Sequence, residues 1–495
     1  MYQDQGHERN ARLEGVVIGL LLLIMLLKGA LWSLALPLWQ GPDEEDHYNV
    51  IQFVAELGHL PDTLDTYLVD EVALSRELAD VGRLPYAPEQ RQAFSDTAIG
   101  PGETAFADLD ARTRSSFDLA MVGKLNKATP LYYMLAALPY RLTASQDLLV
   151  RAHFQRLVSL IMSAGIVVVA YLTARELFPQ NGAMRLTVPI LVAFQPMLTQ
   201  MSAVVSVDGF YFLLYSLLIW LSVRILRDGL TWKNGVVLGT VYATGLLTKP
   251  TLNGFAPLVV LLIAYDFWRG RGRRASVFAG ALAAGFAVLL LSSWWILRSL
   301  RINHDLLYFN PVVEGHRIIQ NPYFGYTFLG HMADYYQSVV GGIFVSWWAH
   351  FGWVDTALPP LVYTVLRILT GLAIAGLLLT LWQRWPTRPS FDSWQAGDSN
   401  APLPVWLFMA LTAIVPIILL QAYDLTFWWQ YGNGRGLQGR YWLGTVIPML
   451  TLFALGLLAL VPPRWRASAH NLLRAGMIVL NFVALLGYIL PRYYL

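Results

Sequence analysis

The sequence predicts an all-α polytopic membrane protein with about eleven transmembrane helices, and three observations support this fold class. Of the 495 residues, 56% are hydrophobic and only 14% are charged, whereas soluble domains carry about 25% charged residues. Apolar stretches close to the roughly 20 residues that cross the hydrocarbon recur along the whole chain. The 18 Trp and 24 Tyr suit a protein with two membrane–water interfaces, where amphipathic rings settle.

The expected spans follow the apolar runs, and long polar segments follow the first and the seventh of them. The spans are Val16–Leu38, Leu157–Leu177, Leu186–Val204, Phe210–Leu226, Val236–Leu247, Leu252–Phe267, Val277–Leu297, Leu361–Leu381, Val405–Leu420, Leu443–Leu460 and Leu472–Leu490. The two polar segments, 40–156 and 299–360, are expected to form large loops on one side of the membrane.

Orientation follows from the bias of Lys and Arg towards cytoplasmic loops. The clearest basic loop is 269–274, which holds four arginines. With this loop inside, the N-terminus is cytoplasmic and both large loops are extracytoplasmic, in a multi-pass protein of the plasma membrane. The apolar stretch Pro130–Tyr140 is too short to span, and counting it would invert every later loop. We expect a juxtamembrane or re-entrant helix there, with a short true span as the alternative.

Composition also excludes several kinds of site. The chain has no cysteine, so it has no disulfides, thiolate metal ligands or cysteine nucleophiles. No basic stripe interleaved with aromatic residues is present, so nucleic acid is not an expected partner. The lipid bilayer is the partner that composition requires.

A dense acidic cluster follows the first span directly. Asp43, Glu44, Glu45, Asp46 and His47 are consecutive. Acids in the first turn of a helix complement its dipole by about 0.3–1 kcal/mol each, which explains one or two of them. It does not explain four, with His47 on the same helical face as Asp43. The pattern therefore favours a functional cluster.

Further polar residues stand at expected external ends of spans. Asp208 begins the fourth span, Lys249 lies in the tight turn after the fifth, and Arg298 closes the seventh. Arg440 and Tyr441 precede the tenth. Basic residues at span ends often extend to the lipid headgroups. Several cations facing an acidic cluster can also grip a phosphate while a carboxylate handles a hydroxyl.

The chain resembles glycosyltransferases of the GT-C superfamily, in the branch related to dolichyl-phosphate-mannose protein mannosyltransferases. Five short motifs carry the resemblance in order: Pro42-Asp43-Glu44 with His47, Thr129-Pro130-Leu131-Tyr132-Tyr133, Arg156-Leu157-Val158-Ser159, Leu247-Thr248-Lys249-Pro250 and Gln438-Gly439-Arg440-Tyr441. The usual His-Pro-Pro-Leu reads Ala128-Thr129-Pro130-Leu131 here. The resemblance implies a GT-C-like module at 1–298 that includes the loop 40–156, a second external loop at 299–360 and a C-terminal transmembrane module at 361–495.

The resemblance also implies a reaction: transfer of a sugar, with inversion, from a polyprenyl-phosphate donor to an acceptor hydroxyl on a protein, lipid or glycan. The implied roles are catalysis by Asp43 and Glu44, acceptor binding by Asp46, His47 and Asp208, and donor-phosphate binding by Lys249, Arg440, Tyr441 and Arg298. Use of a divalent metal, Mg²⁺ or Mn²⁺, stays open.

The alternative is a transporter or flippase of lipid-linked saccharides. Such a protein needs polar residues deep in its spans. Beyond Lys28, near the middle of the first span, the spans between Leu157 and Leu297 offer few. Lys28 itself fits a structural role better than a transport path, so the distribution of polar residues favours chemistry at the external surface.

Overall fold

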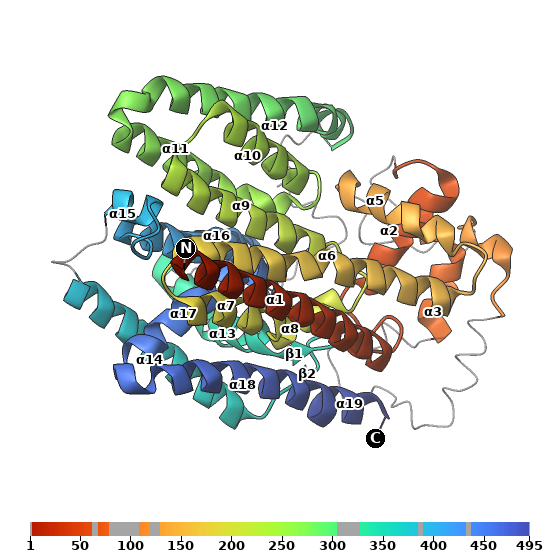
Figure 1. Cartoon of the computed structure of the whole chain (residues 1–495). Helices are drawn as coiled ribbons and strands as arrows, with labels where there is room; N and C mark the ends of the chain where they lie inside the picture. Colours follow the sequence, from red (N-terminus) through yellow and green to blue (C-terminus); the bar gives the residue numbers. More distant parts are fainter. Residues whose placement is uncertain are drawn as a thin grey trace.

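The computed structural model describes residues 2–61, 68–78, 108–117, 129–303, 327–384, 390–431 and 437–494. Within these ranges the chain is almost entirely helical, and the only strands are β1 (His350–Phe351) and β2 (Thr356–Ala357), which form one antiparallel pair (Figure 1). The predicted all-α fold class is confirmed.

The helices follow one another through the chain with short connections. Those of the first half are α1 (Tyr2–Ala35), α2 (Glu44–Leu57), α3 (Asp70–Leu78), η2 (Ala111–Arg114), α5 (Pro130–Leu142), α6 (Leu148–Leu177), α7 (Gly182–Ala193), α8 (Pro196–Ser202), α9 (Asp208–Asp228) and α10 (Trp232–Leu246). Those of the second half are η3 (Pro250–Phe255), α11 (Ala256–Arg269), η4 (Arg271–Arg273), α12 (Arg274–Asn303), α13 (Phe328–Trp348), α14 (Pro360–Arg384), α15 (Phe391–Gln395), α16 (Leu403–Tyr431), η5 (Gly439–Thr445), α17 (Val446–Ala459), η6 (Pro463–Trp465), α18 (Arg466–Ala484), η7 (Leu485–Ile489) and α19 (Leu490–Tyr494).

Nine helical segments of the described chain are long and apolar enough to cross a membrane. They are Arg12–Ala35, Leu148–Leu177, Asp208–Asp228, Pro250–Arg269, Arg271–Arg301, Pro360–Gln383, Leu403–Thr426, Gly439–Ala459 and Pro463–Tyr494. Each coincides with an expected span, so the polytopic character is confirmed for these nine.

The other two expected spans take a different form. The run Leu186–Val204 is divided into α7 and α8, because Pro196 lacks an N–H and the Gln195 side chain caps the new helix. The run Val236–Leu247 belongs to the 15-residue helix α10, which packs closely along α12. A polar break thus divides the first of these runs, whereas one continuous helix covers the second up to Leu246.

Lys28 occupies the break between α7 and α8. Its ammonium donates to the Ala193 carbonyl at 2.5 Å and to the Thr199 hydroxyl at 2.8 Å, and lies 4.7 Å from the centre of the Phe194 ring. The last carbonyls of a helix attract cations, so Lys28 stabilises the interrupted helix. This is the structural role that its sequence context favours.

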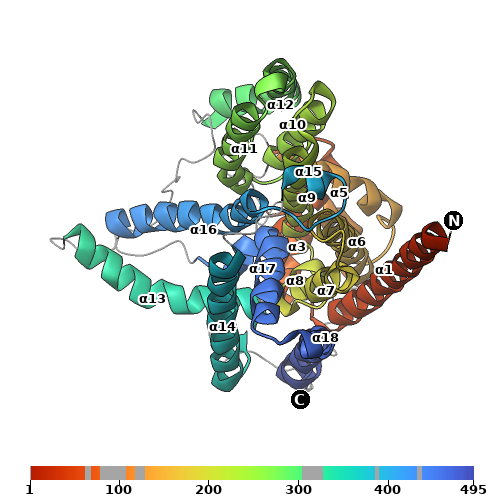
Figure 2. The same ribbon diagram turned by 60° about the vertical axis from the view of Figure 1, so that its left-hand side comes forward.

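The outer helices present apolar side chains outward. Leu20, Leu27 and Leu34 lie seven residues apart on α1 and are all exposed, as are Phe278 and Phe286 on α12. Such faces are unfavourable in water and suit contact with lipid. Figure 2 shows α13 and α16 extending away from α1, which broadens the bundle.

A separate cap covers one end of the bundle (Figure 1). It consists of α2, α3, η2, α5 and the start of α6, and has its own apolar core that includes Tyr48, Val72, Tyr132 and Ala136. α5 lies across α2 in this cap and is too short to count among the candidate spans. This placement agrees with a juxtamembrane helix at Pro130–Tyr140.

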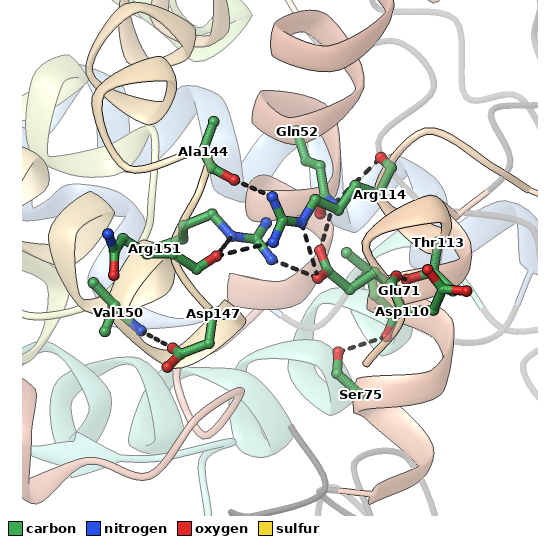
Figure 3. Close-up of polar contacts among 12 residues, drawn as sticks. Gln52, Glu71, Ser75, Asp110, Thr113, Arg114, Ala144, Asp147, Val150 and Arg151 are labelled. Carbon is green, nitrogen blue, oxygen red and sulfur yellow. Dashed lines mark hydrogen bonds and ion pairs between the residues drawn. The ribbon is translucent and has the colours of Figure 1, made fainter. Parts of the chain in front are cut away.

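Buried polar contacts hold the cap together around Glu71 (Figure 3). Its carboxylate forms an ion pair with Arg151 of α6 and accepts a 2.6 Å hydrogen bond from the Gln52 amide of α2. The Arg114 guanidinium of η2 lies 3.8 Å from the same carboxylate. Arg151 also donates to the Tyr140 hydroxyl at 2.7 Å. Glu71 of α3 thus joins three other elements, and Arg151 extends the network to α5, so that α2 has a fixed position at this end of the bundle.

Candidate active site

Asp43 lies in the connection between α1 and α2, in the left-handed backbone conformation (φ 57°). A non-glycine residue rarely adopts this conformation, although Asp tolerates it better than most. Asp43 occupies the N-cap position of α2, yet its side chain makes no capping hydrogen bond. Instead its carboxylate accepts a 2.9 Å bond from the Arg440 guanidinium. Helix capping therefore does not explain this acid.

Arg440 reaches Asp43 from η5, 397 residues further along the chain. The preceding Gly439 sets its place: the Gly439 N–H donates to the Ser346 hydroxyl of α13 at 2.7 Å. A Cβ atom on Gly439 would lie 2.2 Å from the backbone nitrogen of Trp347, which real structures do not allow. The close approach of η5 and α13 thus requires glycine beside Arg440.

The second ion pair joins Asp208 and Lys249. Asp208 opens α9 and is buried, and its carboxylate accepts a hydrogen bond from the Lys249 ammonium. The turn that holds Lys249 is fixed by the start of α5. There Thr129 donates to the Thr248 carbonyl at 2.5 Å, and Leu131 donates to the Leu247 carbonyl at 3.0 Å. Two of the short motifs, far apart in sequence, therefore meet at Lys249.

Tyr441 brings the two ion pairs into one site. The Arg440 guanidinium lies 5.2 Å from the centre of the Tyr441 ring, and the Lys249 ammonium lies 5.5 Å from the same centre. Tyr211 of α9 offers a second ring, 5.7 Å from Lys249. Aromatic faces attract cations, so the rings hold both positive groups at one end of the bundle.

His47 lies one turn after Asp43 on α2, at the same site. Its Nδ1 and the Tyr133 hydroxyl are 2.8 Å apart. Burial lowers the pKa of His47 to about 4, against the opposing influence of the nearby Asp208 and Asp43 carboxylates. The imidazole is therefore neutral near pH 7. Asp46, on the same turn, is also buried, and its charge helps to raise the pKa of Tyr133, which burial raises most.

Glu44 points elsewhere. Both of its carboxylate oxygens accept bonds from Arg156 of α6, at 2.6 and 2.7 Å, and neither side chain is exposed. The Arg156 guanidinium also donates to the carbonyls at the end of α1, namely Ser33, Leu36 and Pro37, at 2.6–2.9 Å. This Glu44–Arg156 clamp fastens the connection that carries Asp43 to α6.

Arg298 lies near the C-terminal end of α12. Its guanidinium donates to the Pro61 carbonyl at 2.6 Å and lies 4.9 Å from the centre of the Trp295 ring. The described contacts of Arg298 are thus with the loop after α2 and with its own helix, not with the two ion pairs. Among the residues that the structure describes, no three His, Asp or Glu side chains gather in a way that would hold a metal ion.

Sequence reasoning assigned no role to Arg156, Tyr133 or Tyr211. The first two stand within the short motifs, and an arginine in an otherwise apolar helix is a signal for a buried partner. Tyr211 carries no such signal, because one tyrosine among many in the spans is unremarkable until Lys249 is seen beside it.

The fold and the site define a multi-pass membrane protein with paired charges gathered beneath a helical cap at one end of its bundle. The family described as "Predicted membrane protein (DUF2142)" matches residues 26–452. The chain belongs to this family.

Two solved structures are similar to the chain, each at 13% identity. Both are of ArnT from Cupriavidus metallidurans. In the form bound to undecaprenyl phosphate the TM-score is 0.45, with 96% of this chain and 73% of that chain covered. In the apo form the TM-score is 0.36, with 90% and 71% covered. No curated protein matches the sequence significantly.

Proposed function

We propose that this protein is an inverting glycosyltransferase that moves a sugar from a polyprenyl-phosphate donor to an acceptor hydroxyl. The observation that carries the proposal is the meeting of two cations and two carboxylates from four separate segments. Arg440 pairs with Asp43, and Lys249 pairs with Asp208, around the shared ring of Tyr441. The motif resemblance to GT-C enzymes supports the same reading.

The donor phosphate would bind at Lys249 and Arg440. Each cation is neutralised by a carboxylate in the structure, so an incoming phosphate competes with Asp208 and Asp43 for them. Positive groups held in place in advance stabilise the charge that grows on a leaving phosphate. The polyprenyl chain would lie along the apolar helices, and this explains why the reaction requires a membrane protein.

Asp43 would act as the general base. When the donor phosphate draws Arg440 away, the Asp43 carboxylate becomes available to the acceptor hydroxyl. The hydroxyl oxygen attacks the anomeric carbon as the bond from that carbon to the phosphate oxygen breaks. The phosphate keeps the bonding electron pair, and the hydroxyl proton passes to Asp43. One displacement inverts the configuration at the anomeric carbon.

The neutral side chains beside the Asp43–Arg440 pair would orient the acceptor. His47 and Tyr133 are hydrogen-bonded to each other and buried beside Asp43 and Asp208, so they offer both donor and acceptor atoms to a hydroxyl. Asp46 adds a further carboxylate on the same helical turn. Arg298 would bind the donor phosphate from the end of α12, in exchange for its present hydrogen bond to the Pro61 carbonyl.

Glu44 would position the base and not react. Its pairing with Arg156 leaves it buried and fully engaged in the Glu44–Arg156 clamp. The adjacent Asp43 is held in a strained conformation by that clamp, which is a common way for folds to fix a reactive group. Glu44 and Asp43, although consecutive, thus take different roles.

We place the site on the extracytoplasmic face of the plasma membrane, with the N-terminus in the cytoplasm. The basic loop 269–274 supports this orientation. It lies between α11 and α12, whereas Lys249 and Arg298 lie at the other ends of those two segments.

Turnover of a labelled donor tests the proposal. Purified protein in proteoliposomes receives polyprenyl-phosphate sugars, with and without Mg²⁺ or Mn²⁺, and released polyprenyl phosphate is measured. The proposal expects release that depends on Arg440. A protein that moves the intact donor between leaflets, without cleaving it, would instead be a flippase and would refute the proposed reaction.

A further inference from the structure

A cavity of about 250 Å³ opens at the far end of α17 from Arg440. On α17 (Val446–Ala459) the cavity is lined from Leu452 onward. Leu452 lies about 9 Å along the axis from the start of the helix, so the cavity is separate from the site beneath the cap. The cavity lies where α14 and α17 end and where α16 and α18 begin.

The interior of this cavity is apolar. Leu377 and Leu381 of α14, Leu407 of α16, and Leu452 and Leu455 of α17 line it. An apolar cavity between membrane helices fits a hydrocarbon chain, because the chain exchanges one apolar surrounding for another and fills a void.

The mouth of the cavity is polar and basic. Arg466 and His470, both from the first turns of α18, stand there with Asn181 and Asn400. The exposed Arg466 makes one hydrogen bond, from Nε to the Val461 carbonyl at 3.3 Å, and has no carboxylate partner among the described residues. His470 is fixed by a 2.9 Å contact between its Nδ1 and the Thr187 hydroxyl.

Asn400 adds an unsatisfied acceptor at this mouth. Its Oδ1 atom is buried and has no hydrogen-bond partner in the described chain. Buried polar atoms almost always find a partner, and rotation of the Asn400 amide towards the cavity would let this atom accept a hydrogen bond from a ligand hydroxyl. The positive charge of Arg466 favours an anionic group at the same place.

We propose that this cavity binds one anionic glycerophospholipid with a hydroxyl-bearing headgroup, of the phosphatidylglycerol type. One acyl chain enters the leucine-lined interior, the phosphate pairs with Arg466, and a headgroup hydroxyl donates to Asn400. Basic pockets between membrane helices at the cytoplasmic side bind anionic headgroups in this way. The bound lipid joins α14, α16, α17 and α18 and stabilises their packing. This site is independent of the proposed transferase reaction.

Lipid titration of the delipidated full-length protein tests the proposal. Native mass spectrometry measures retention of dioleoyl-phosphatidylglycerol, and the melting temperature is followed in parallel. Dioleoyl-phosphatidylcholine, with the same chains and no net charge, is the comparison lipid. We expect the anionic lipid to be retained and to raise the melting temperature, and the zwitterionic lipid to do neither.

Three variants locate the effect. Arg466→Ala should weaken phosphatidylglycerol binding about fivefold, the effect of one basic residue near an anionic headgroup, and Arg466→Glu should weaken it more. Ala410→Phe fills the cavity and should abolish retention. Arg464→Ala, in the preceding turn and outside the cavity lining, is the matched control and should bind like wild type.

Several outcomes would overturn the proposal. These are equal retention of the two lipids, unchanged binding by both Arg466 variants, or displacement of phosphatidylglycerol by a polyprenyl phosphate, which would assign the cavity to the donor lipid. Since Arg466 is exposed, its variants keep the test valid if Ala410→Phe fails to fold. The readouts are binding and melting, so this proposal and the transferase proposal stand or fall separately.

Discussion

Replacing Glu44 by Gln separates a positioning role from a catalytic one. The substitution keeps the shape of the side chain but removes the charge that Arg156 neutralises, where both partners are fully buried. Arg156 would then keep its hydrogen bonds to the three carbonyls at and just after the end of α1, while its buried charge lost its counter-ion. Breaking a buried ion pair by removing one partner costs roughly 3–5 kcal/mol. We therefore expect a clearly lower melting temperature.

The assay combines thermal unfolding in detergent with donor turnover measured well below the melting transition. Glu44→Gln should unfold early and turn over slowly, because Asp43 is no longer held in place. Asp43→Asn is the matched control: Asn also tolerates the left-handed conformation and Asp43 caps no helix. Its side chain is 35% exposed, whereas that of Glu44 is fully buried, so loss of the pair with Arg440 should lower the melting temperature less than Glu44→Gln does. A Glu44→Gln protein that melts like wild type yet has no activity would show that Glu44 takes part in the chemistry.

Three further predictions concern the surroundings of the ion pairs. Gly439→Ala forces a Cβ against the backbone of Trp347 and should lower both melting temperature and turnover, whereas Gly341→Ala, with open space around it, should change neither. Lys249→Gln should raise the KM for the donor about 10- to 100-fold, as expected for the loss of one charged hydrogen bond of about 1.5–3 kcal/mol. The KM for the acceptor should stay unchanged. A change in the acceptor KM alone would argue against phosphate binding by Lys249. The pKa of His47 is lowered from 6.5 to about 4, so unfolding exposes an imidazole that takes up a proton more readily than the folded one. The contribution of His47 to the free energy of unfolding should be complete above pH 6.5 and decrease by roughly 3 kcal/mol towards pH 4. A His47→Gln protein whose melting temperature decreases as steeply with falling pH would contradict this.

Much of the fold was predictable because membrane spans leave a strong signal. An apolar run long enough to cross the bilayer forms a helix, since every backbone polar group must then be satisfied internally. That rule is weakest where a helix is interrupted inside the protein, as between α7 and α8, because Lys28 and Gln195 satisfy the freed groups there. Apolar runs do not reveal such local partners. The division at 298 and 360 stays a prediction.

The four charged residues that form the two ion pairs were predictable from the sequence, but the way they pair was not. Asp43, Asp208, Lys249 and Arg440 were expected together because each stands at a span end on one face. The partner of Glu44 was not foreseen, since Arg156 is 112 residues away and their contact depends on how α6 crosses α1. Consecutive acids looked equivalent in sequence, and only the turn at Asp43 sends the two carboxylates to different partners. The catalytic and binding roles stay predictions.

The decisive measurement is single-turnover release of polyprenyl phosphate from a labelled polyprenyl-phosphate sugar by wild type and by Asp43→Asn. Removal of a general base typically slows a reaction about 10²- to 10⁴-fold. We predict release by wild type and a loss of that size in Asp43→Asn, with donor binding retained and a melting temperature lowered less than in Glu44→Gln. Equal release by the two proteins would contradict the assignment of the base, and no release by wild type from any donor would contradict the proposed reaction.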